Sequence, residues 1–349
     1  MVDVKYPAFI GTAERVELDR AMSRIAKAVT DKRADFLFGA GMSVASNVPS
    51  GLPLATELLG LFFSDGSLDE ARRRELATTL PFECVAQAIE RSSGKGRDDL
   101  TSYLKEVFLS RTFDINQAHR DFLSICFWDG RPMLNRIFTT NFDSLLEKAL
   151  GARGVRITED NTQEIANVQR AEKLPILYLH GTLENGSYQI TETDVFNRRF
   201  RALHHIFRTA LNEADAFVFV GYSMSDPDFR SLYMDYREEM DLRQKANKKA
   251  YVVAPEKDVH AYALGKGIWE SREAVWLPLD AESFFSGIKS ILDQRVSKEE
   301  KERIMKKYHL KDEKAFLEKV ELTAQILRIE KGEAIQFLSE ARTKTGAKE

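Results

Sequence analysis

The stretch that decides the fold runs from Phe36 to Leu54 and reads FLFGAGMSVASNVPSGLPL. It opens with Phe36-Leu37-Phe38, a short apolar run that is typical of a strand buried on both faces. The run ends in Gly39-Ala40-Gly41, and Ser43 follows. Because glycines let the backbone turn sharply and present unpaired N–H groups to an anion, the pattern predicts the first half of a nucleotide-binding βα unit. Val44 stands where the fingerprint G-x-G-x-x-G has its third glycine, so an ordinary tight turn explains this motif alone at least as well.

The composition sets limits on size, partners and compartment. The chain has 349 residues, 43% of them hydrophobic and 30% charged, which suffices for a large core and for two domains or one domain with appendages. The net charge of −3 gives no reason to expect direct nucleic-acid or membrane-surface binding. Cys84 and Cys126 cannot form a four-cysteine zinc site, and their apolar contexts indicate core positions. With no basic-apolar leader and no run of roughly 20 apolar residues, we expect a soluble, cytoplasmic protein.

Apolar runs followed by polar or glycine-bearing residues recur along the chain. Residues 14–30 and 53–63 have the spacing of helices, and residues 65–135 read as a helical insertion without a convincing strand. Short apolar runs alternating with helices indicate an α/β fold with a doubly wound parallel sheet, in which a ligand lies beyond the carboxyl ends of the strands. The six expected strands are residues 36–38, 134–140, 176–179, 216–220, 251–255 and 274–278.

The composition changes near residue 296, where a run of Lys and Glu begins. We therefore expect a helical lead-in at residues 1–30, a nucleotide-binding domain at 31–295 and a charged helical C-terminal tail at 296–349. An apolar stripe on one face of the tail predicts a surface that docks on the core or on another subunit. The stripe consists of Phe316, Leu317, Val320, Ala324 and Leu327.

Polar motifs follow four of the expected strands: GAGMS at 39–43, TTNFD at 139–143, HG at 180–181 and GYS at 221–223. Together and in this order they resemble the NAD-dependent sirtuin family, whose signatures are G-A-G-x-S, T-Q-N-x-D and H-G, with a later G-T/Y-S turn. The resemblance covers residues 31 to 290. It implies a Rossmann-like, sirtuin-type fold, with NAD bound as a substrate.

The resemblance also assigns roles to single residues. Asn141 would contact the nicotinamide ribose or position a nucleophile, Asp143 would bind the nicotinamide carboxamide, and His180 would be the catalytic base. A neutral imidazole suits mild proton transfer at cellular pH, and loss of nicotinamide needs orientation more than a strong base. The other residues expected to bind the cofactor, the first four at its pyrophosphate, are Gly39, Ala40, Gly41, Ser43, Gly221 and Ser223.

The sequence departs from the deacylases of this family. Residues 182–187 stand where those enzymes carry a zinc ribbon of two Cys-x-x-Cys pairs, and Thr140 replaces the glutamine of T-Q-N. These departures argue against acyl-lysine recognition and predict that the protein holds no zinc or other metal. The zinc-less pattern resembles the bacterial sirtuin-like NAD hydrolases of antiphage defence, which deplete NAD on infection. That resemblance implies a homo-oligomer or a regulatory partner such as an ATPase or a nuclease.

The motif residues also have plain structural interpretations. Asn141 is placed to cap a helix beginning at Phe142, and His180 before a glycine fits a core position. Convergence at the strand ends nevertheless favours catalysis. Three functions stay open: an NAD glycohydrolase releasing nicotinamide and linear or cyclic ADP-ribose, a deacylase or ADP-ribosyltransferase with the same pocket, and a non-catalytic sensor of NAD or a related nucleotide. The missing ribbon argues against the second, and intact Asn141 and His180 argue against the third.

Overall fold

The computed structural model describes residues 4–63, 65–92, 96–128, 130–184, 186–196, 201–222, 233, 249–327 and 338. The chain divides into two compact units, Met1–Lys289 and Ser290–Glu349. The boundary lies inside helix α13 (Ala281–Lys307). The first unit contains the sheet and all the described residues of the predicted site.

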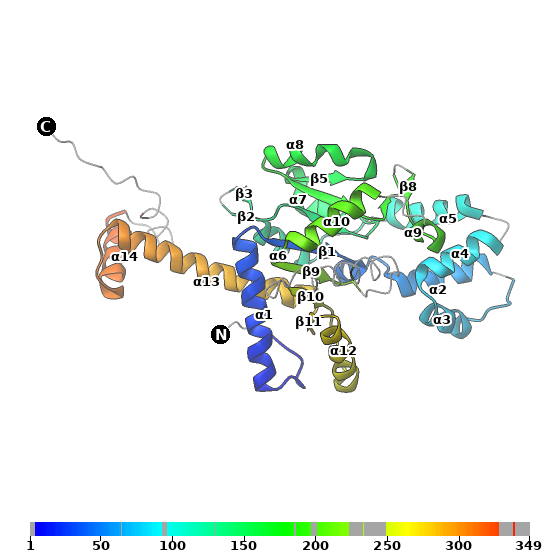
Figure 1. The fold of residues 1–349 in the computed structure, drawn as a ribbon, viewed down its shortest axis with the longest axis horizontal. Coiled ribbons are helices and arrows are strands. Elements are labelled where there is room, and N and C mark those ends of the chain that lie inside the picture. Colours follow the sequence, from blue (N-terminus) through cyan, green and yellow to red (C-terminus); the bar gives the residue numbers. More distant parts are fainter. Residues whose placement is uncertain are drawn as a thin grey trace. The chain divides into compact units, whose positions relative to one another are not determined.

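The strands of the central sheet are β1 (Ala34–Phe38), β4 (Ile137–Thr139), β5 (Gly154–Ile157), β6 (Leu174–Tyr178), β9 (Ala216–Val220), β10 (Lys249–Val253) and β11 (Ala274–Leu277). They form one seven-stranded parallel sheet in the order β11-β10-β9-β1-β4-β6-β5 (Figure 1). Every residue of β1 is buried, as the uninterrupted apolar run predicts for a central strand. The predicted parallel α/β sheet is confirmed.

Strand β5 is the strand of the central sheet that the sequence did not predict. It lies at the edge of the sheet, where its first three residues are only half-buried. An edge strand tolerates the charged side chain of Arg156, and this charge interrupts the apolar run by which a strand is recognised in the sequence. The strand expected at 134–140 begins only at Ile137. A short antiparallel pair, β2 (Phe127–Trp128) and β3 (Arg131–Pro132), corrects the expectation that 65–135 holds no strand.

Helices form close to where apolar spacing predicts them. Asp69 and Asn116 stabilise two helix starts, because their carboxylate and amide oxygens accept the N–H groups of Arg72 and His119. The α-helices are α1 (Thr12–Thr30), α2 (Gly51–Phe62), α3 (Glu70–Thr79), α4 (Phe82–Ser92), α5 (Gly96–Lys105), α6 (Gln117–Cys126), α7 (Leu145–Leu150), α8 (Ile165–Arg170), α9 (Glu192–Phe196), α10 (Arg201–Glu213), α12 (Val259–Ser271), α13 and α14 (Glu313–Leu327). Shorter helical turns are η1 (Ala40–Met42), η2 (Val44–Ser46), η3 (Glu106–Ser110), η4 (Gly151–Arg153) and η5 (Glu159–Glu164).

Both faces of the sheet are covered, because alternate strand residues point to opposite sides. On one face, side chains of β1, β4, β6 and β9 pack with α10 in a single buried cluster. On the other, Phe36 and Phe38 lie 5.6 and 4.7 Å from the ring of Phe122 in α6, measured between centroids. Phe285 of α13 packs against the same three rings. The sheet is therefore doubly wound.

Helices α2 to α5 and η3 form a separate cluster, which we call the helical module. Figure 1 shows these helices together, next to α9 and strand β8 (Ser187–Tyr188). Strand β8 pairs antiparallel with β7 (Gly181–Thr182), and we call this pair the hairpin. Leu183, Tyr188 and Ile190 are buried in the apolar core of the helical module. The hairpin that follows His180 is thus packed on the helical module.

The second unit has a small core of its own. Its buried residues are Ile304, Phe316, Val320 and Leu338. Phe316 and Val320 belong to the predicted stripe and are buried within this core. Docking of the stripe on the rest of the chain or on another subunit stays a prediction. In the described parts of the chain, no helix combines the length and apolar character needed to cross a membrane.

Candidate functional site at the carboxyl edge of the sheet

The carboxyl ends of β1, β4, β6 and β9 bring the predicted motifs to one edge of the sheet. The loop 39–43 follows β1, residues 140–143 follow β4, His180 follows β6 closely and Gly221 follows β9. From β1 the chain continues to β4 on one side, and from β9 to β10 on the other, so β1 and β9 form the switch point of the sheet. Ligands of open parallel sheets bind in the crevice at such a point.

The loops after β1 and β9 touch through glycine backbone. The N–H of Gly39 donates to the carbonyl of Val220 at 3.0 Å, and the N–H of Gly41 donates to the carbonyl of Gly221 at 2.9 Å. A Cβ on Gly41 would lie 2.6 Å from the Cα of Gly221, and a Cβ on Gly221 would lie 2.5 Å from the nitrogen of Met42. Gly221 also has a φ of 62°, in the left-handed region. These glycines are needed because two backbones meet with no room for a side chain.

Most amide donors of the loop 39–43 are used inside the protein. In addition to Gly39 and Gly41, Ser43 donates its N–H to the carbonyl of Ala40 at 3.0 Å, within turn η1. The N–H of Ala40 has no acceptor among the described residues. The expectation of unpaired amides is therefore corrected for three of the four predicted pyrophosphate-binding residues, and among these four only Ala40 keeps an N–H without an acceptor in the described part of the chain.

Asn141 reaches the same loop from the end of β4. Its Nδ2 donates to the carbonyl of Gly39 at 3.2 Å and to Ser43 Oγ at 3.4 Å. Its backbone N–H donates to Thr139 Oγ1 at 3.0 Å. Helix α7 begins only at Leu145, so Asn141 does not cap it, contrary to the plain interpretation of the sequence. The amide instead joins two strand ends.

Ser43 and Asp143 are the buried partners of Asn141. Ser43 is fully buried and Asp143 is 6% exposed. Burial raises the pKa of Asp143, while hydrogen bonds from the Leu145 N–H and from the side chains of Ser43 and Asn141 act in the opposite direction. The Leu145 N–H lies 3.0 Å from Asp143 Oδ1. We call Ser43, Asn141 and Asp143 the polar cluster.

His180 follows the end of β6 just as Asn141 follows the end of the neighbouring strand β4. Thr139 pairs with Tyr178 in the register of β4 and β6, and two residues further along each strand come Asn141 and His180. His180 is 9% exposed, and its carbonyl accepts the N–H of Gln189 at 2.8 Å. The hairpin begins at the next residue. Sheet and hairpin together fix the backbone of His180.

Two further polar residues at the loop, Asn116 and His119, had no role in the sequence analysis. Asn116 Nδ2 donates to the carbonyl of Met42 at 2.8 Å, and its Oδ1 accepts the His119 N–H at 3.1 Å. Burial, followed by the charge of Arg120, lowers the pKa of His119 to about 4, so its imidazole is neutral at pH 7. His119 Nε2 has no partner in the described part of the chain. The sequence signals a helix cap here, but it carries no sign of the contact with Met42.

The remaining predicted features are placed as follows. Ser223 lies outside the described residues. Cys84 is half-buried, whereas Cys126 is buried as the sequence indicated. Within the described ranges, His, Cys, Asp and Glu form no group of three or more suited to a metal ion. The zinc-free state of the protein stays a prediction.

Comparisons with known proteins show a similarity to one family over part of the chain. Residues 135–275 match a family model described as the SIR2-like domain. This stretch includes Asn141, Asp143, His180 and Gly221, whereas the loop 39–43 precedes it. A comparison with curated proteins found no match. A solved structure from work on the mechanism and regulation of Sir2 enzymes is 14% identical, with 79% of this chain and 98% of that chain covered and a TM-score of 0.44. Residues 135–275 are thus similar to a SIR2-like domain, and the chain has an α/β fold with a parallel sheet.

Proposed function

We propose that this protein is an NAD glycohydrolase that cleaves NAD into nicotinamide and ADP-ribose. The observation that carries the proposal is the polar cluster at the switch point, with His180 after the end of the neighbouring strand β6. A SIR2-like domain implies the use of NAD. Dinucleotides bind at the carboxyl edge of such sheets, where these residues lie.

In the proposed reaction the bond between C1′ of the ribose and the nicotinamide nitrogen breaks, and its electron pair leaves with nicotinamide. Positive charge then develops on the ribose, so orientation of the reacting groups contributes more than a strong base. Asn141 would hold the ribose or the attacking water, and Asp143 would support the carboxamide end. Water adds to C1′ and gives up a proton, which His180 would accept.

The pyrophosphate would lie against the loop 39–43. We assign its anchor to the N–H of Ala40, which has no acceptor among the described residues. Gly39 and Gly41 would shape this loop through their contacts with the turn after β9 rather than by donating to the phosphates. Gly221 would act on the nucleotide indirectly, by holding the loop in place.

We also propose that the enzyme acts in antiphage defence and depletes NAD only when triggered. The zinc-less motif pattern supports this role through its resemblance to defence NAD hydrolases. Silence before infection would come from a homo-oligomer or from a partner such as an ATPase or a nuclease. Light scattering on the purified chain, alone and with the products of neighbouring genes, tests this part. A monomer that cleaves NAD at full rate without a partner would contradict it.

The activity is tested by incubating the purified protein with NAD, with and without its genomic neighbours, and by quantifying the products by chromatography. We expect nicotinamide and ADP-ribose in equal amounts, without an acyl-lysine peptide. Nicotinamide released only when such a peptide is present would identify a deacylase instead. NAD that binds in calorimetry but stays intact under all conditions would identify a sensor.

A further inference from the structure

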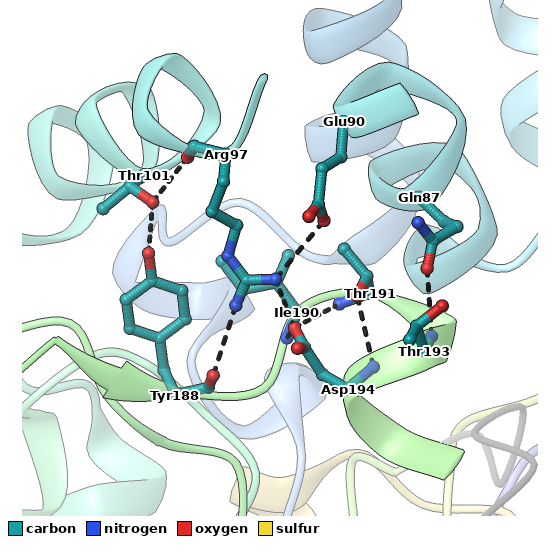
Figure 2. A network of polar contacts seen from close by, with 9 residues as sticks. All are labelled: Gln87, Glu90, Arg97, Thr101, Tyr188, Ile190, Thr191, Thr193 and Asp194. Atoms are coloured by element: carbon teal, nitrogen blue, oxygen red, sulfur yellow. Dashed lines mark hydrogen bonds and ion pairs between the residues drawn. The ribbon is translucent and has the colours of Figure 1, made fainter. Parts of the chain in front are cut away.

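A network of polar contacts links the helical module to the residues that follow His180. Arg97, in the first turn of α5, donates from Nη1 to Asp194 Oδ2 at 2.5 Å (Figure 2). The same nitrogen lies 3.4 Å from Glu90 Oε2 in α4. Its second terminal nitrogen, Nη2, donates to the carbonyl of Tyr188 at 3.4 Å. One guanidinium therefore joins two helices of the module to both ends of the segment 188–194.

Asp194 connects Arg97 to the turn that follows the hairpin. Its Oδ2 accepts the N–H of Ile190 at 3.1 Å and the N–H of Thr191 at 3.2 Å. In return, Thr191 Oγ1 accepts the N–H of Asp194 at 3.2 Å. Burial raises the pKa of Asp194, but these hydrogen bonds and Arg97 outweigh it, and the net pKa is lowered. Asp194 is thus a buried, charged carboxylate that depends on its cationic partner.

The hairpin itself is held at Tyr188. The Arg97 guanidinium lies 5.1 Å from the centre of the Tyr188 ring, and the Tyr188 hydroxyl is hydrogen-bonded to Thr101 Oγ1. Tyr188 pairs with Gly181 in the hairpin, directly after His180. The next residue, Gln189, donates its N–H to the carbonyl of His180. Two hydrogen bonds and the peptide bond between Tyr188 and Gln189 therefore link Arg97 to the backbone of His180.

From this geometry we infer that Arg97 is a positioning residue for His180. The inference rests on the proposed function, in which His180 accepts a proton. Arg97 touches the segment that fixes His180 and acts through it. It also lies outside the stretch that matches the SIR2-like domain, so the helical module contributes to the site from outside that stretch. Because a misplacement of a catalytic group by about 1 Å can reduce catalysis about 100-fold, loss of the Arg97 contacts should lower kcat.

The test compares Arg97→Met and Arg97→Lys with Arg72→Met, a control whose ion pair with Glu75 is exposed on α3 of the same module. We expect Arg97→Met to lower kcat for NAD cleavage about 10- to 100-fold, with KM within about twofold of the parental value. Arg97→Lys should keep part of the activity, since lysine retains the charge but not the planar fork. Arg72→Met should match the parental chain. Calorimetric NAD affinity and melting curves show that each variant is folded.

The deciding experiment combines Arg97→Met with His180→Ala in a double variant and measures its residual NAD cleavage at high enzyme concentration. If Arg97 acts through His180, the double variant is no slower than His180→Ala alone. Equal losses in both backgrounds, or an unchanged kcat in Arg97→Met, would overturn the inference while leaving the proposed function standing. A parental chain that releases no nicotinamide under any condition would overturn the proposed function itself.

Discussion

On the β1–β9 side of the site, two loops meet backbone against backbone at Gly41 and Gly221, whereas on the β6 side charged side chains hold the hairpin. The first contact depends on the absence of a side chain and involves no ionised group. The second depends on Arg97 and on a buried carboxylate, Asp194. Substitutions and salt concentration should therefore change the stability of the two sides differently.

A second arginine reinforces the charged side. Arg156, on the edge strand β5, donates from Nε and Nη2 to the two carboxylate oxygens of Glu147, each at 2.6 Å. Its Nη1 lies 2.9 Å from Glu184, which follows β7. The Tyr178 hydroxyl donates to Glu147 at 3.2 Å. The segment after His180 is thus bound by one arginine from the sheet and another from the helical module.

The largest effect should follow a side chain on the glycine side. Gly221→Val places a Cβ 2.5 Å from the Met42 nitrogen, at a φ that valine rarely adopts. We expect the free energy of unfolding to fall by about 3 kcal/mol or more, measured by urea denaturation. Gly267→Ala is the matched control, because this helical glycine has nothing within 4 Å of its Cβ position. Its stability should stay equal or rise. Equal losses in both variants would contradict the close contact.

A smaller effect should follow loss of charge on the hairpin side. Arg156→Met leaves Glu147 and Glu184 without their cation, and we expect a loss of about 2 kcal/mol in the free energy of unfolding. The loss should shrink in high salt, since these groups are partly exposed, whereas the effect of Gly221→Val should not change. Arg72→Met, with its exposed pair, should lose less than about 1 kcal/mol. A salt-independent loss in Arg156→Met would contradict the comparison.

The smallest effect should arise at the opposite, amino edge of the sheet. Burial, opposed by Arg136, raises the pKa of Asp35 to about 6. The folded state therefore binds this proton more tightly than the unfolded state, and stability falls as the pH rises from about 4 to about 6. Asp35→Asn should remove this fall, which is about 1 kcal/mol between pH 5 and pH 6, in urea denaturation at these two pH values. NAD cleavage should be unaffected. An identical pH dependence in both chains would contradict the assignment.

The sequence predicted the sheet and the strand ends best, because buried central strands are continuous apolar runs. It failed at the edge, where half-exposed β5 tolerates Arg156. It also misjudged the use of the glycines, since the partner of Gly41 is Gly221, far along the chain. Arg97 and Asp194 are 97 positions apart, and no local pattern marks such a pair. Contacts between distant segments are what the sequence alone did not supply.

The central claim is that Asn141 and His180 carry NAD cleavage at the carboxyl edge of the sheet. The most direct test is nicotinamide release by the parental chain, Asn141→Ala and His180→Ala. Asn135→Ala serves as the control, because Asn135 is exposed at the opposite end of β4 and donates to the carbonyl of Lys32.

We predict release by the parental chain and by Asn135→Ala, and rates about 100- to 10,000-fold lower in the two site variants, with cooperative melting curves that show both variants folded. A folded Asn141→Ala or His180→Ala variant that releases nicotinamide at the parental rate would contradict the account.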